Sequence, residues 1–339
     1  MPEIPSMMRA SVLRAARDLV IEQRPTPSAA AGEVLVRVEA VGVCGSDVHY
    51  YQHGRVGDFV VDAPLVLGHE AAGTVVDVGD GVADSLVGSR VSIEPGVPCR
   101  HCRACRSGAY NLCPDVQFFA TPPVDGAFAE FVAVPSDFVT ALPDTVSTAA
   151  GALLEPLSVA YWACRKANVR PGERLLVTGA GPVGLLVLQV ARALGCTNVA
   201  VSDVAQQRLD TAAALGATST HLAGTDPLPS ADMLIECSGA APAVAGGIGA
   251  LGAGGRAVLV GMGADEAVLP VSRIQRYEIS VTGTFRYAST WPAALDLAAS
   301  GAVELDALVT SRHALADAQS ALELNPASGH IKAIVEPHR

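Results

Sequence analysis

Aromatic and charged residues are both scarce in this sequence. Phe, Trp and Tyr make up 4% of the 339 residues and charged residues 17%, whereas half of the chain is hydrophobic. Aliphatic side chains and glycine must therefore pack most of the core, which suits the close layers of an α/β protein. A chain of this length predicts two domains of ordinary size.

The sequence also lacks basic clusters and long apolar runs. Its net charge is −11 and no run of Lys and Arg stands out, so nucleic acid and anionic membranes are not expected partners. The N-terminal segment has no apolar stretch typical of a signal peptide, and no run is long enough for a membrane-spanning helix. These absences favour a cytoplasmic protein, in which stable disulfides are rare.

Strand-like segments dominate the first 150 residues. β-branched stretches separated by glycine and proline lie at 33–44, 70–79, 89–96 and 126–135, and this pattern is typical of strands. We expect a partly open, barrel-like β domain in this part of the chain.

From about Leu153 onward, helix-like and strand-like segments alternate. A helix is predicted over 153–167, and strands over 174–179, 198–203, 232–237, 256–261 and 279–285, with a weak one at 219–222. Such alternation predicts a doubly wound parallel sheet. The tail has helical pattern at 291–301 and 314–325, and a strand-like end at 330–337.

A glycine motif lies between the first predicted strand and helix of this region. Gly179-x-Gly181-x-x-Gly184 follows an apolar strand and begins the helix predicted over 182–194, which is the context of a dinucleotide site. Gly179 would permit the tight turn, Gly181 the approach of pyrophosphate, and Gly184 close helix–strand packing. The helix N-terminus would then bind the phosphates. A glycine-rich turn without a ligand is the alternative.

Asp203 ends the second predicted strand, 19 residues after Gly184. A carboxylate there would accept a hydrogen bond from the adenine ribose 2′-hydroxyl and repel a 2′-phosphate, which favours NAD over NADP. Arg208 follows closely and leaves the opposite preference open, because an arginine can bind that phosphate.

Four of the eight cysteines occur in the 15-residue segment CRHCRACRSGAYNLC. Four thiolates this close can surround one tetrahedral ion, and such a closed site leaves no position for substrate, so we predict a structural zinc. Disulfides are rare in the cytoplasm, where we expect this protein to be. A redox C-x-x-C usually begins the helix of a βαβ unit, which this segment does not. The predicted ligands are Cys99, Cys102, Cys105 and Cys113.

A second set of possible ligands is scattered along the chain: Cys44, His69, Glu70 and Glu155. Together they offer thiolate, imidazole and carboxylate, a mixture that leaves a catalytic zinc one exchangeable position. Taken singly, each has a simpler interpretation: Cys44 as a small buried hydrophobe, the His-Glu pair as a surface turn, and Glu155 as a helix N-terminal acid. The remaining cysteines are expected to serve packing.

The motifs GVCGSDVHYY, GHEAAG, the four-cysteine loop, EPLSVA, GAGPVG and GTFRY occur in this order. Over nearly its whole length the chain resembles the zinc-dependent medium-chain dehydrogenases. FFATPPVDGAFAEF, LLEPLSVAYWAC and GTFRYASTWP resemble the polyol branch, which acts on sorbitol, L-iditol and xylitol. Plain alcohol dehydrogenases typically have cysteine at the position of Glu155. Some polyol enzymes lack the four-cysteine loop that this chain keeps, so the particular polyol is not carried over.

The resemblance implies a fold and an assembly. It predicts a GroES-like β-rich domain over 1–152, completed by 287–339, and a Rossmann coenzyme domain over 153–286. A homotetramer is usual in such a family.

The resemblance also implies roles for single residues. Cys44, His69 and Glu70 match catalytic zinc ligands, and Glu155 matches a residue that contacts the zinc directly or through its water. With the cysteine loop this makes two zinc ions per chain. Ser46 and His49 match a proton relay, with a turn serine and a surface histidine as the alternatives. Residues matching the substrate site are Tyr50, Phe118, Thr121, Glu155, Arg286 and Tyr287. Residues expected to contact the cofactor are Gly179, Gly181, Pro182, Val183, Gly184, Asp203, Arg208, Gly261, Met262, Gly263, Thr284, Phe285 and Arg286.

The implied reaction is hydride transfer between NAD and a secondary hydroxyl of a sugar alcohol, giving a ketose. Alternatives are the same machinery acting on L-threonine, butanediol or a hexitol such as galactitol, or a homologue that binds NAD and zinc without turnover. A zinc-ribbon interaction module would explain only the cysteine loop.

Overall fold

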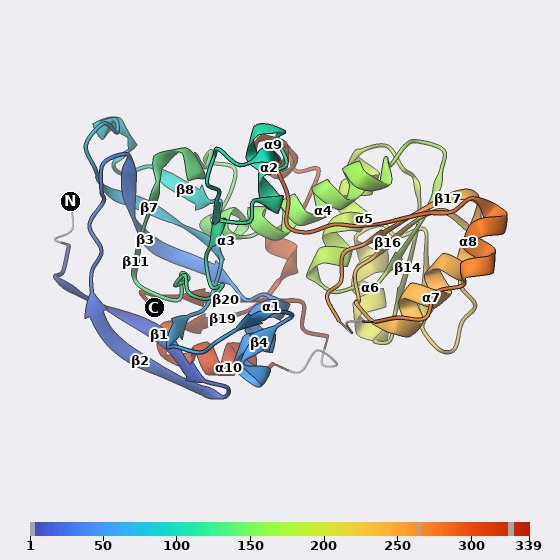
Figure 1. The fold of residues 1–339 in the computed structure, drawn as a ribbon, viewed down its shortest axis with the longest axis horizontal. Helices are drawn as coiled ribbons and strands as arrows, with labels where there is room; N and C mark the ends of the chain where they lie inside the picture. The colour runs from blue at the N-terminus through green and yellow to red at the C-terminus, as the bar shows by residue number, and fades with distance from the viewer. Residues whose placement is uncertain (1–3, 264–265, 325–328) are drawn as a thin grey trace. The chain divides into compact units, whose positions relative to one another are not determined.

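The computed structural model describes residues 4–263, 266–324 and 329–339 (Figure 1). The chain divides into two compact units. Unit 1 comprises Met1–Glu155, Leu305–Asn325 and Lys332–Arg339, and unit 2 comprises Pro156–Glu304 and Pro326–Ile331.

Unit 1 is built around a seven-stranded sheet with the order β12-β8-β7-β3-β20-β19, in which β11 also pairs with β3. Alternate residues of β3 explain its central place: Val34, Val36 and Val38 are fully buried, while Arg37 and Glu39 form an ion pair at 3.2 Å. The strands are β3 (Glu33–Gly42), β7 (Glu70–Val78), β8 (Arg90–Ile93), β11 (Phe131–Pro135), β12 (Val139–Ala141), β19 (Val309–Ala314) and β20 (Lys332–Glu336).

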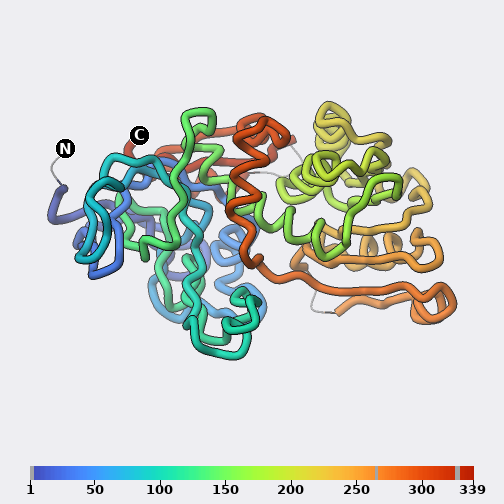
Figure 2. Tube along the Cα trace, turned by 90° about the horizontal axis from the view of Figure 1, so that it is seen from above, coloured from blue at the N-terminus to red at the C-terminus, as the bar shows by residue number. Residues whose placement is uncertain are grey.

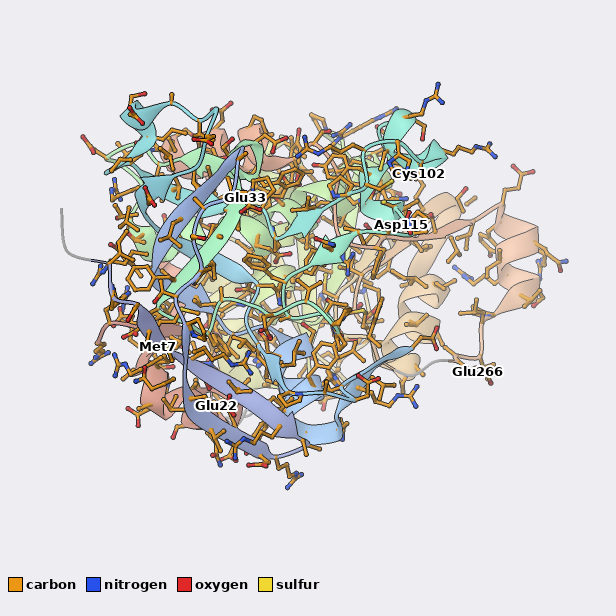
Figure 3. The ribbon with its side chains drawn as sticks, turned by 60° about the vertical axis from the view of Figure 1, so that its left-hand side comes forward. Met7, Glu22, Glu33, Cys102, Asp115 and Glu266 are labelled. Atoms are coloured by element: carbon orange, nitrogen blue, oxygen red, sulfur yellow. The ribbon has the colours of Figure 1, made fainter. Side chains whose placement is uncertain are left out.

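An N-terminal hairpin, not expected from the sequence, adds a second sheet with the order β2-β1-β6. Its two long strands pair antiparallel across a turn in which Arg17 has a positive φ of 65°; Met7 and Glu22 mark them in Figure 3. The strands are β1 (Met7–Ala15), β2 (Asp18–Pro25) and β6 (Leu65–Val66). Two short pairs complete the unit: β4 (Arg55–Val56) with β5 (Phe59–Val60), and β9 (Gly96–Val97) with β10 (Gln117–Phe118).

The helices of unit 1 are short. They are α1 (Gly45–His53), α2 (Arg103–Arg106), α3 (Thr148–Ala152) and α10 (Ala318–Leu322). Single 3-10 turns occur at η1 (Asp84–Leu86), η2 (Tyr110–Leu112), η3 (Ser136–Phe138), η4 (Asp306–Leu308) and η5 (Leu315–Asp317).

Unit 2 contains a six-stranded parallel sheet with the order β15-β14-β13-β16-β17-β18. This arrangement, with helices between the strands, confirms the predicted α/β class and doubly wound topology. The strands are β13 (Arg174–Thr178), β14 (Asn198–Asp203), β15 (Ser219–Leu222), β16 (Ala231–Glu236), β17 (Leu251–Leu259) and β18 (Ser280–Gly283). The helices are α4 (Leu154–Ala167), which begins in unit 1, α5 (Pro182–Ala193), α6 (Gln206–Ala214), α7 (Ala241–Ala250), α8 (Val271–Tyr277) and α9 (Trp291–Ala299). The long orange tube in Figure 2 is the extended segment with β18 that joins α8 to α9.

The return of the chain to unit 1 differs from the sequence-based expectation. We expected it at residue 287, but residues up to Glu304 belong to unit 2. The reason is a direct tie to this unit: the backbone N–H of Glu304 donates to Oε1 of Gln189 in α5 at 2.7 Å, and Val303 is buried. The boundary before the parallel sheet likewise falls after Glu155 rather than at 152.

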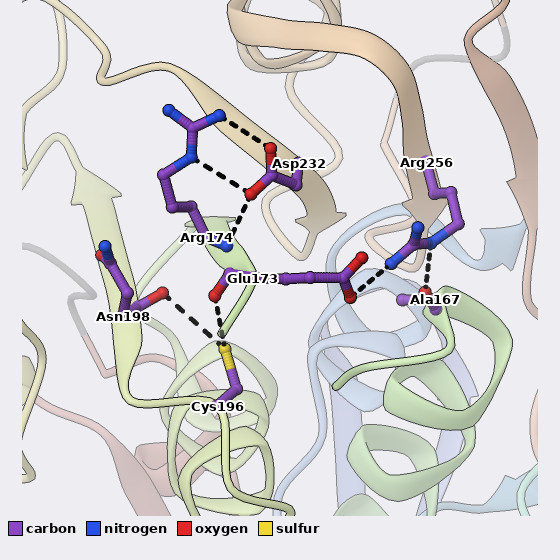
Figure 4. Close-up of polar contacts among 7 residues, drawn as sticks. All are labelled: Ala167, Glu173, Arg174, Cys196, Asn198, Asp232 and Arg256. Atoms are coloured by element: carbon purple, nitrogen blue, oxygen red, sulfur yellow. Dashed lines mark hydrogen bonds and ion pairs between the residues drawn. The ribbon is translucent and has the colours of Figure 1, made fainter. Parts of the chain in front are cut away.

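Ion pairs gather where the parallel strands begin (Figure 4). Arg174 donates from Nη2 to Oδ1 of Asp232, and Arg256 from Nη2 to Oε2 of Glu173, both at 2.7 Å. The thiol of Cys196 donates to the carbonyl of Glu173 at 3.3 Å, in keeping with a packing role. The dinucleotide motif lies at the other ends of these strands.

A search of the described residues for a helix with the length and apolar character needed to cross a bilayer finds none.

Candidate functional site

Strand register places the first candidate ligands together in unit 1. β3 and β7 pair antiparallel with Gly42 opposite Glu70, so the residues just after β3 lie beside the start of β7. A ligand atom from each of Cys44, His69 and Glu70 then lies within 4.8 Å of the other two. His69 and Glu70 are buried, which excludes the interpretation of this pair as a surface turn.

Gly42 provides the space that this arrangement needs. A Cβ at this position would lie 1.9 Å from Oε2 of Glu70, a separation that no side chain can adopt. The carboxylate of Glu70 therefore lies directly against the backbone of β3.

Asp47, which we did not select from the sequence, supports two of the candidate ligands. Its carboxylate is fully buried and accepts from the backbone N–H of Cys44 at 3.0 Å and of Gly68 at 2.9 Å. Its Oδ1 lies 3.7 Å from Nδ1 of His69, an arrangement that fixes imidazole orientation in metal sites. Burial lowers the pKa of His69, but the charges of Asp47 and Cys44 outweigh it and hold that pKa well above its usual range. An acid three residues after a helix-capping position was the available sequence signal.

Lys332 is a second residue that the sequence analysis missed. From β20 its Nζ donates to both carboxylate oxygens of Glu70 at 2.8 Å and to the carbonyl of Val43 at 2.9 Å. Burial lowers the pKa of Lys332, but the charges of Glu70 and Cys44 outweigh it, and the pKa is raised. A lysine inside an apolar strand was the signal.

Glu155 is buried at the start of α4. Its charge contributes to the raised pKa of Lys332, so this carboxylate belongs to the same neighbourhood. It is not part of the group whose ligand atoms all lie within 4.8 Å of one another among the described residues. A thiolate, an imidazole and a carboxylate, with a second carboxylate nearby, fit a catalytic zinc with one exchangeable position.

The four-cysteine loop forms a second candidate metal centre in unit 1 (Cys102 is labelled in Figure 3). Sγ of Cys105 lies 3.4 Å from Sγ of Cys102 and 3.9 Å from Sγ of Cys99. With Sγ of Cys113 as the fourth, these sulfur atoms all lie within 4.8 Å of one another. Tetrahedral Zn–S bonds imply sulfur separations of about 3.8 Å. All eight cysteines are free thiols, so this geometry fits an ion rather than a disulfide.

The thiols of this loop differ in how readily they ionise to the thiolate form that binds a metal. Hydrogen bonds from the backbone amides of His101 and Cys102 lower the pKa of Cys99 to about 6. Desolvation and hydrogen bonds with Cys102 and Cys113 raise the pKa of Cys105 to about 12. Four thiolates this close repel one another, so a divalent cation is needed to bring all of them into the ionised state.

In the dinucleotide motif of unit 2, the turn and the start of the helix pack as closely as its glycines predict. Gly179 has a positive φ of 91°, and a Cβ on Gly184 would lie 1.8 Å from the carbonyl oxygen of Gly179. Gly181 caps α5, with Pro182 and Val183 in its first turn. Asp203 accepts from the backbone N–H of Ala180 at 2.6 Å and of Ala205 at 2.8 Å. Its carboxylate therefore also fixes the shape of the turn.

Arg208 lies beside this turn. Its Nη2 donates to the carbonyl of His330 at 3.2 Å, and its Nη1 lies 4.0 Å from where a Cβ on Gly181 would be. The guanidinium is thus close to the expected cofactor phosphates and ribose.

The loops after β16 and β17 lie at the same edge of the sheet, and their glycines let the two backbone segments pack closely together. A Cβ on Gly261 would lie 2.1 Å from the N atom of Gly239, and one on Gly263 would lie 2.0 Å from the oxygen of Gly239. Glu236, another residue that the sequence analysis missed, is fully buried and accepts from the backbone N–H groups of Ser238 and Gly239. Met262 and Phe285 are exposed, and Thr284 is half-buried.

The expected relay and substrate residues divide between the two units. In unit 1, Ser46 is half-buried and His49 exposed on α1, Tyr50 is buried, and Thr121 is half-buried. The buried ring of Phe118 lies 5.6 Å from that of His69, between centroids. In unit 2, the guanidinium of Arg286 lies 4.7 Å from the centroid of the Phe285 ring, and Tyr287 is buried against Trp291, with ring centroids 5.4 Å apart.

The chain combines a β-rich unit, which carries a thiol–imidazole–carboxylate cluster and a four-cysteine loop, with a parallel sheet of the dinucleotide-binding type. This combination defines the class of zinc-dependent dehydrogenases. Family models agree: an alcohol dehydrogenase GroES-like domain matches residues 30–144, and a zinc-binding dehydrogenase domain matches residues 182–300.

Comparison with individual relatives also indicates the branch of this family. The chain is 40% identical to sorbitol dehydrogenase of Bacillus subtilis, over 99% of both chains. It is 44% identical to sorbitol dehydrogenase of Mus musculus, over 90% of this chain and 89% of the relative. Among solved structures it is similar to 2R,3R-butanediol dehydrogenase of Bacillus subtilis, with 31% identity, a TM-score of 0.88, and coverage of 97% and 99%. The chain belongs to the zinc-dependent medium-chain dehydrogenase family, in its polyol branch.

Proposed function

We propose that this chain is an NAD-dependent polyol dehydrogenase. It oxidises a secondary hydroxyl of a sugar alcohol to a ketone, with NAD⁺ taking the hydride and one proton leaving to solvent. The cluster of Cys44, His69 and Glu70 carries this proposal, because a metal ion held there would act as a Lewis acid that activates an alcohol for hydride transfer to the cofactor. The sorbitol dehydrogenases among its relatives support the substrate class.

The side chains divide the chemical tasks among themselves. Zinc held by Cys44, His69 and a carboxylate would supply a Lewis acid for the substrate hydroxyl, and NAD⁺ would accept the hydride. Asp47, whose Oδ1 lies 3.7 Å from Nδ1 of His69, would help to orient this imidazole. The exposed His49, with Ser46 in the same helix, would carry the released proton to solvent.

Specificity for polyols would come from polar groups that pair with neighbouring hydroxyls. We assign this role to Tyr50, Glu155 and Arg286. A substrate without those hydroxyls would make fewer hydrogen bonds with these groups, which disfavours simple alcohols. Phe118, Thr121 and Tyr287 would shape the remainder of the substrate site.

A panel of alcohols scored by NADH absorbance tests the proposal. We expect sorbitol, xylitol, L-iditol or galactitol to give the highest kcat/KM. Butanediol is the second candidate, because a butanediol dehydrogenase shares the fold over nearly the whole chain, and L-threonine is a third. Preference for either would overturn the polyol assignment. Turnover of no alcohol by zinc-loaded protein would favour a binding protein without catalysis.

Replacing Asp203 with alanine is expected to shift cofactor preference toward NADP. The ratio of kcat/KM with NADP to that with NAD should rise about tenfold or more, equal to about 1.4 kcal/mol, because the carboxylate no longer repels a 2′-phosphate. Both values should also fall, since Asp203 holds the amides of Ala180 and Ala205. Asp203→Asn is the matched control: it keeps an acceptor oxygen and should shift the ratio with a smaller loss. An unchanged ratio in both variants would contradict the assigned role.

We also propose two zinc ions per chain, one catalytic and one structural, a homotetrameric assembly and a cytoplasmic location. The metal content of purified protein and its mass by light scattering test the first two statements directly.

A further inference from the structure

Helix α1 carries a pair of histidines on its outer face (α1 is labelled in Figure 1). His49 and His53 lie four residues apart, so their side chains leave the same face of the helix about one turn from each other. Their ring centroids are 5.8 Å apart, and the ring planes are tilted by 44°. Both residues are exposed, so an ion from solvent can reach both imidazoles.

The opposite face of α1 holds the helix in place. Asp47, Tyr50 and Tyr51 are buried, and the hydroxyl of Tyr51 donates to Oε1 of Glu323 at the end of α10. Gly54, with a positive φ of 69°, ends the helix, and its N–H donates to the carbonyl of Tyr50 at 2.9 Å. The backbone that presents the two imidazoles is therefore fixed, while the exposed rings can still rotate.

The separation of the two rings suits a metal ion that both can bind. With metal–nitrogen bonds of about 2.0–2.1 Å, two imidazoles on one ion have ring centroids roughly 5 Å apart. The observed separation of 5.8 Å needs only a small rotation of one exposed side chain. Two histidines at positions i and i+4 of a helix are also the arrangement that binds zinc in metalloproteases.

The ligand type indicates which ions would bind. Imidazole suits zinc, nickel and copper, whereas magnesium and calcium prefer oxygen ligands. Within the described part of the chain, neither ring has a hydrogen bond or ion pair that would hold it away from an ion. A site with two protein ligands leaves its other positions to water, so it would exchange its ion more readily than a site with three or four protein ligands.

We propose that His49 and His53 form a surface site for one divalent transition-metal ion, such as zinc or nickel, and that an ion bound there inhibits the enzyme. The inhibition rests on the proposed function, in which His49 carries the proton of the substrate hydroxyl to solvent. A relay through imidazole needs both ring nitrogens, one to accept the proton and the other to release it. A metal ion on one of these nitrogens blocks the relay.

Calorimetric titration of the full-length, zinc-loaded protein with Ni²⁺ tests the site without turnover. Nickel is the probe because it binds imidazole and elemental analysis distinguishes it from the resident zinc. We expect the wild type to bind one nickel ion while keeping its zinc. His53→Gln and His49→Gln should each bind nickel at least about tenfold more weakly, because loss of a ligand costs no less than loss of a residue behind one.

His221→Gln is the matched control for this titration. His221 is half-buried on β15, its Nε2 lies 2.9 Å from Oγ of Ser219, and no histidine lies four residues before or after it. Its replacement should leave nickel binding at the wild-type level. Absence of nickel binding by the wild type, or equal binding by His53→Gln, would overturn the proposed site.

Polyol oxidation with added Ni²⁺ tests the inhibition. For each protein, kcat with nickel is divided by kcat without it. Saturating nickel should lower this ratio at least about tenfold in the wild type, since general acid–base groups contribute about 100-fold or more, and should leave it near one in His53→Gln. An equal fall in both proteins would overturn the inhibitory role, because the nickel would then act elsewhere. If no polyol is oxidised, the proposed function fails, and the calorimetry still decides whether the histidine pair binds metal.

Discussion

Replacing Cys44 with alanine is expected to lower kcat/KM for polyol oxidation by at least about 1,000-fold, because a metal ion acting as Lewis acid contributes several kcal/mol to such a step. The thiolate is the one sulfur donor in the group with His69 and Glu70, and without it the ion should be lost. The fold should remain, because the bond from the backbone N–H of residue 44 to Asp47 does not involve the thiol. Zinc content should fall by one ion per chain, and the thermal unfolding midpoint should change little.

A matched control separates the site from cysteine loss in general. Cys164 is fully buried in unit 2, and burial raises its pKa beyond the range useful for metal binding or catalysis. Cys164→Ala should therefore keep both zinc ions and near wild-type kcat. Full activity in Cys44→Ala would contradict the catalytic zinc assignment, and equal losses in both variants would indicate a structural effect.

The two metal centres differ in how far the sequence predicts them. Cys99, Cys102, Cys105 and Cys113 lie in one short segment, so local spacing alone brings their thiols together. The first set depends on tertiary structure, because Cys44 meets Glu70 only through the register in which Gly42 lies opposite Glu70. The spacing of residues along the sequence does not predict that register. Only the family resemblance could therefore predict that Cys44 and Glu70 lie in one site.

A similar distinction holds for the fold. The parallel strands of unit 2 were predictable because buried parallel strands are continuous apolar runs flanked by glycine: β13 was expected at 174–179 and is found at Arg174–Thr178. The hairpin β1–β2 was missed, since the exposed residues of Asp18–Pro25 interrupt its apolar pattern. Helix α1 was missed because it is short and largely polar, and its first turn depends on Asp47, whose carboxylate also binds the amide of Gly68.

Residues that act behind the ligands are the hardest to predict. Asp47 is an ordinary helix-capping acid in the sequence, and Lys332 a single charge in an apolar strand. Their importance becomes visible only when a partner distant in the chain, His69 for Asp47 and Glu70 for Lys332, is placed within contact distance. Each is then a charged group beside a predicted metal ligand, the place from which such groups orient ligands in metal sites.

The loop zinc should behave in the opposite way to the catalytic zinc. We expect Cys102→Ser to remove one zinc ion per chain and to lower the thermal unfolding midpoint by at least about 5 °C, since metal-binding energy in a closed site contributes directly to folding. The regular structure of the loop is limited: α2 and η2 are short, and Leu112 is 58% exposed, while the hydroxyl of Tyr110 donates to Oε1 of Glu94 at 2.7 Å. The ion pair of Arg100 with Asp137 at 2.8 Å is solvent-exposed and therefore worth little.

The chemical step should survive this loss. At a temperature where the variant is folded, kcat should stay within about threefold of wild type, because four thiolates leave no position for substrate. Ser107→Ala is the matched control, since Ser107 lies on the same loop and its hydroxyl donates only to the carbonyl of Ala104; both zinc ions and the unfolding midpoint should be retained. A loss of kcat in Cys102→Ser as large as that in Cys44→Ala would show that the loop takes part in catalysis. An unchanged zinc content would show that these thiols hold no ion, and the loop would then need another explanation for the close approach of its four sulfur atoms.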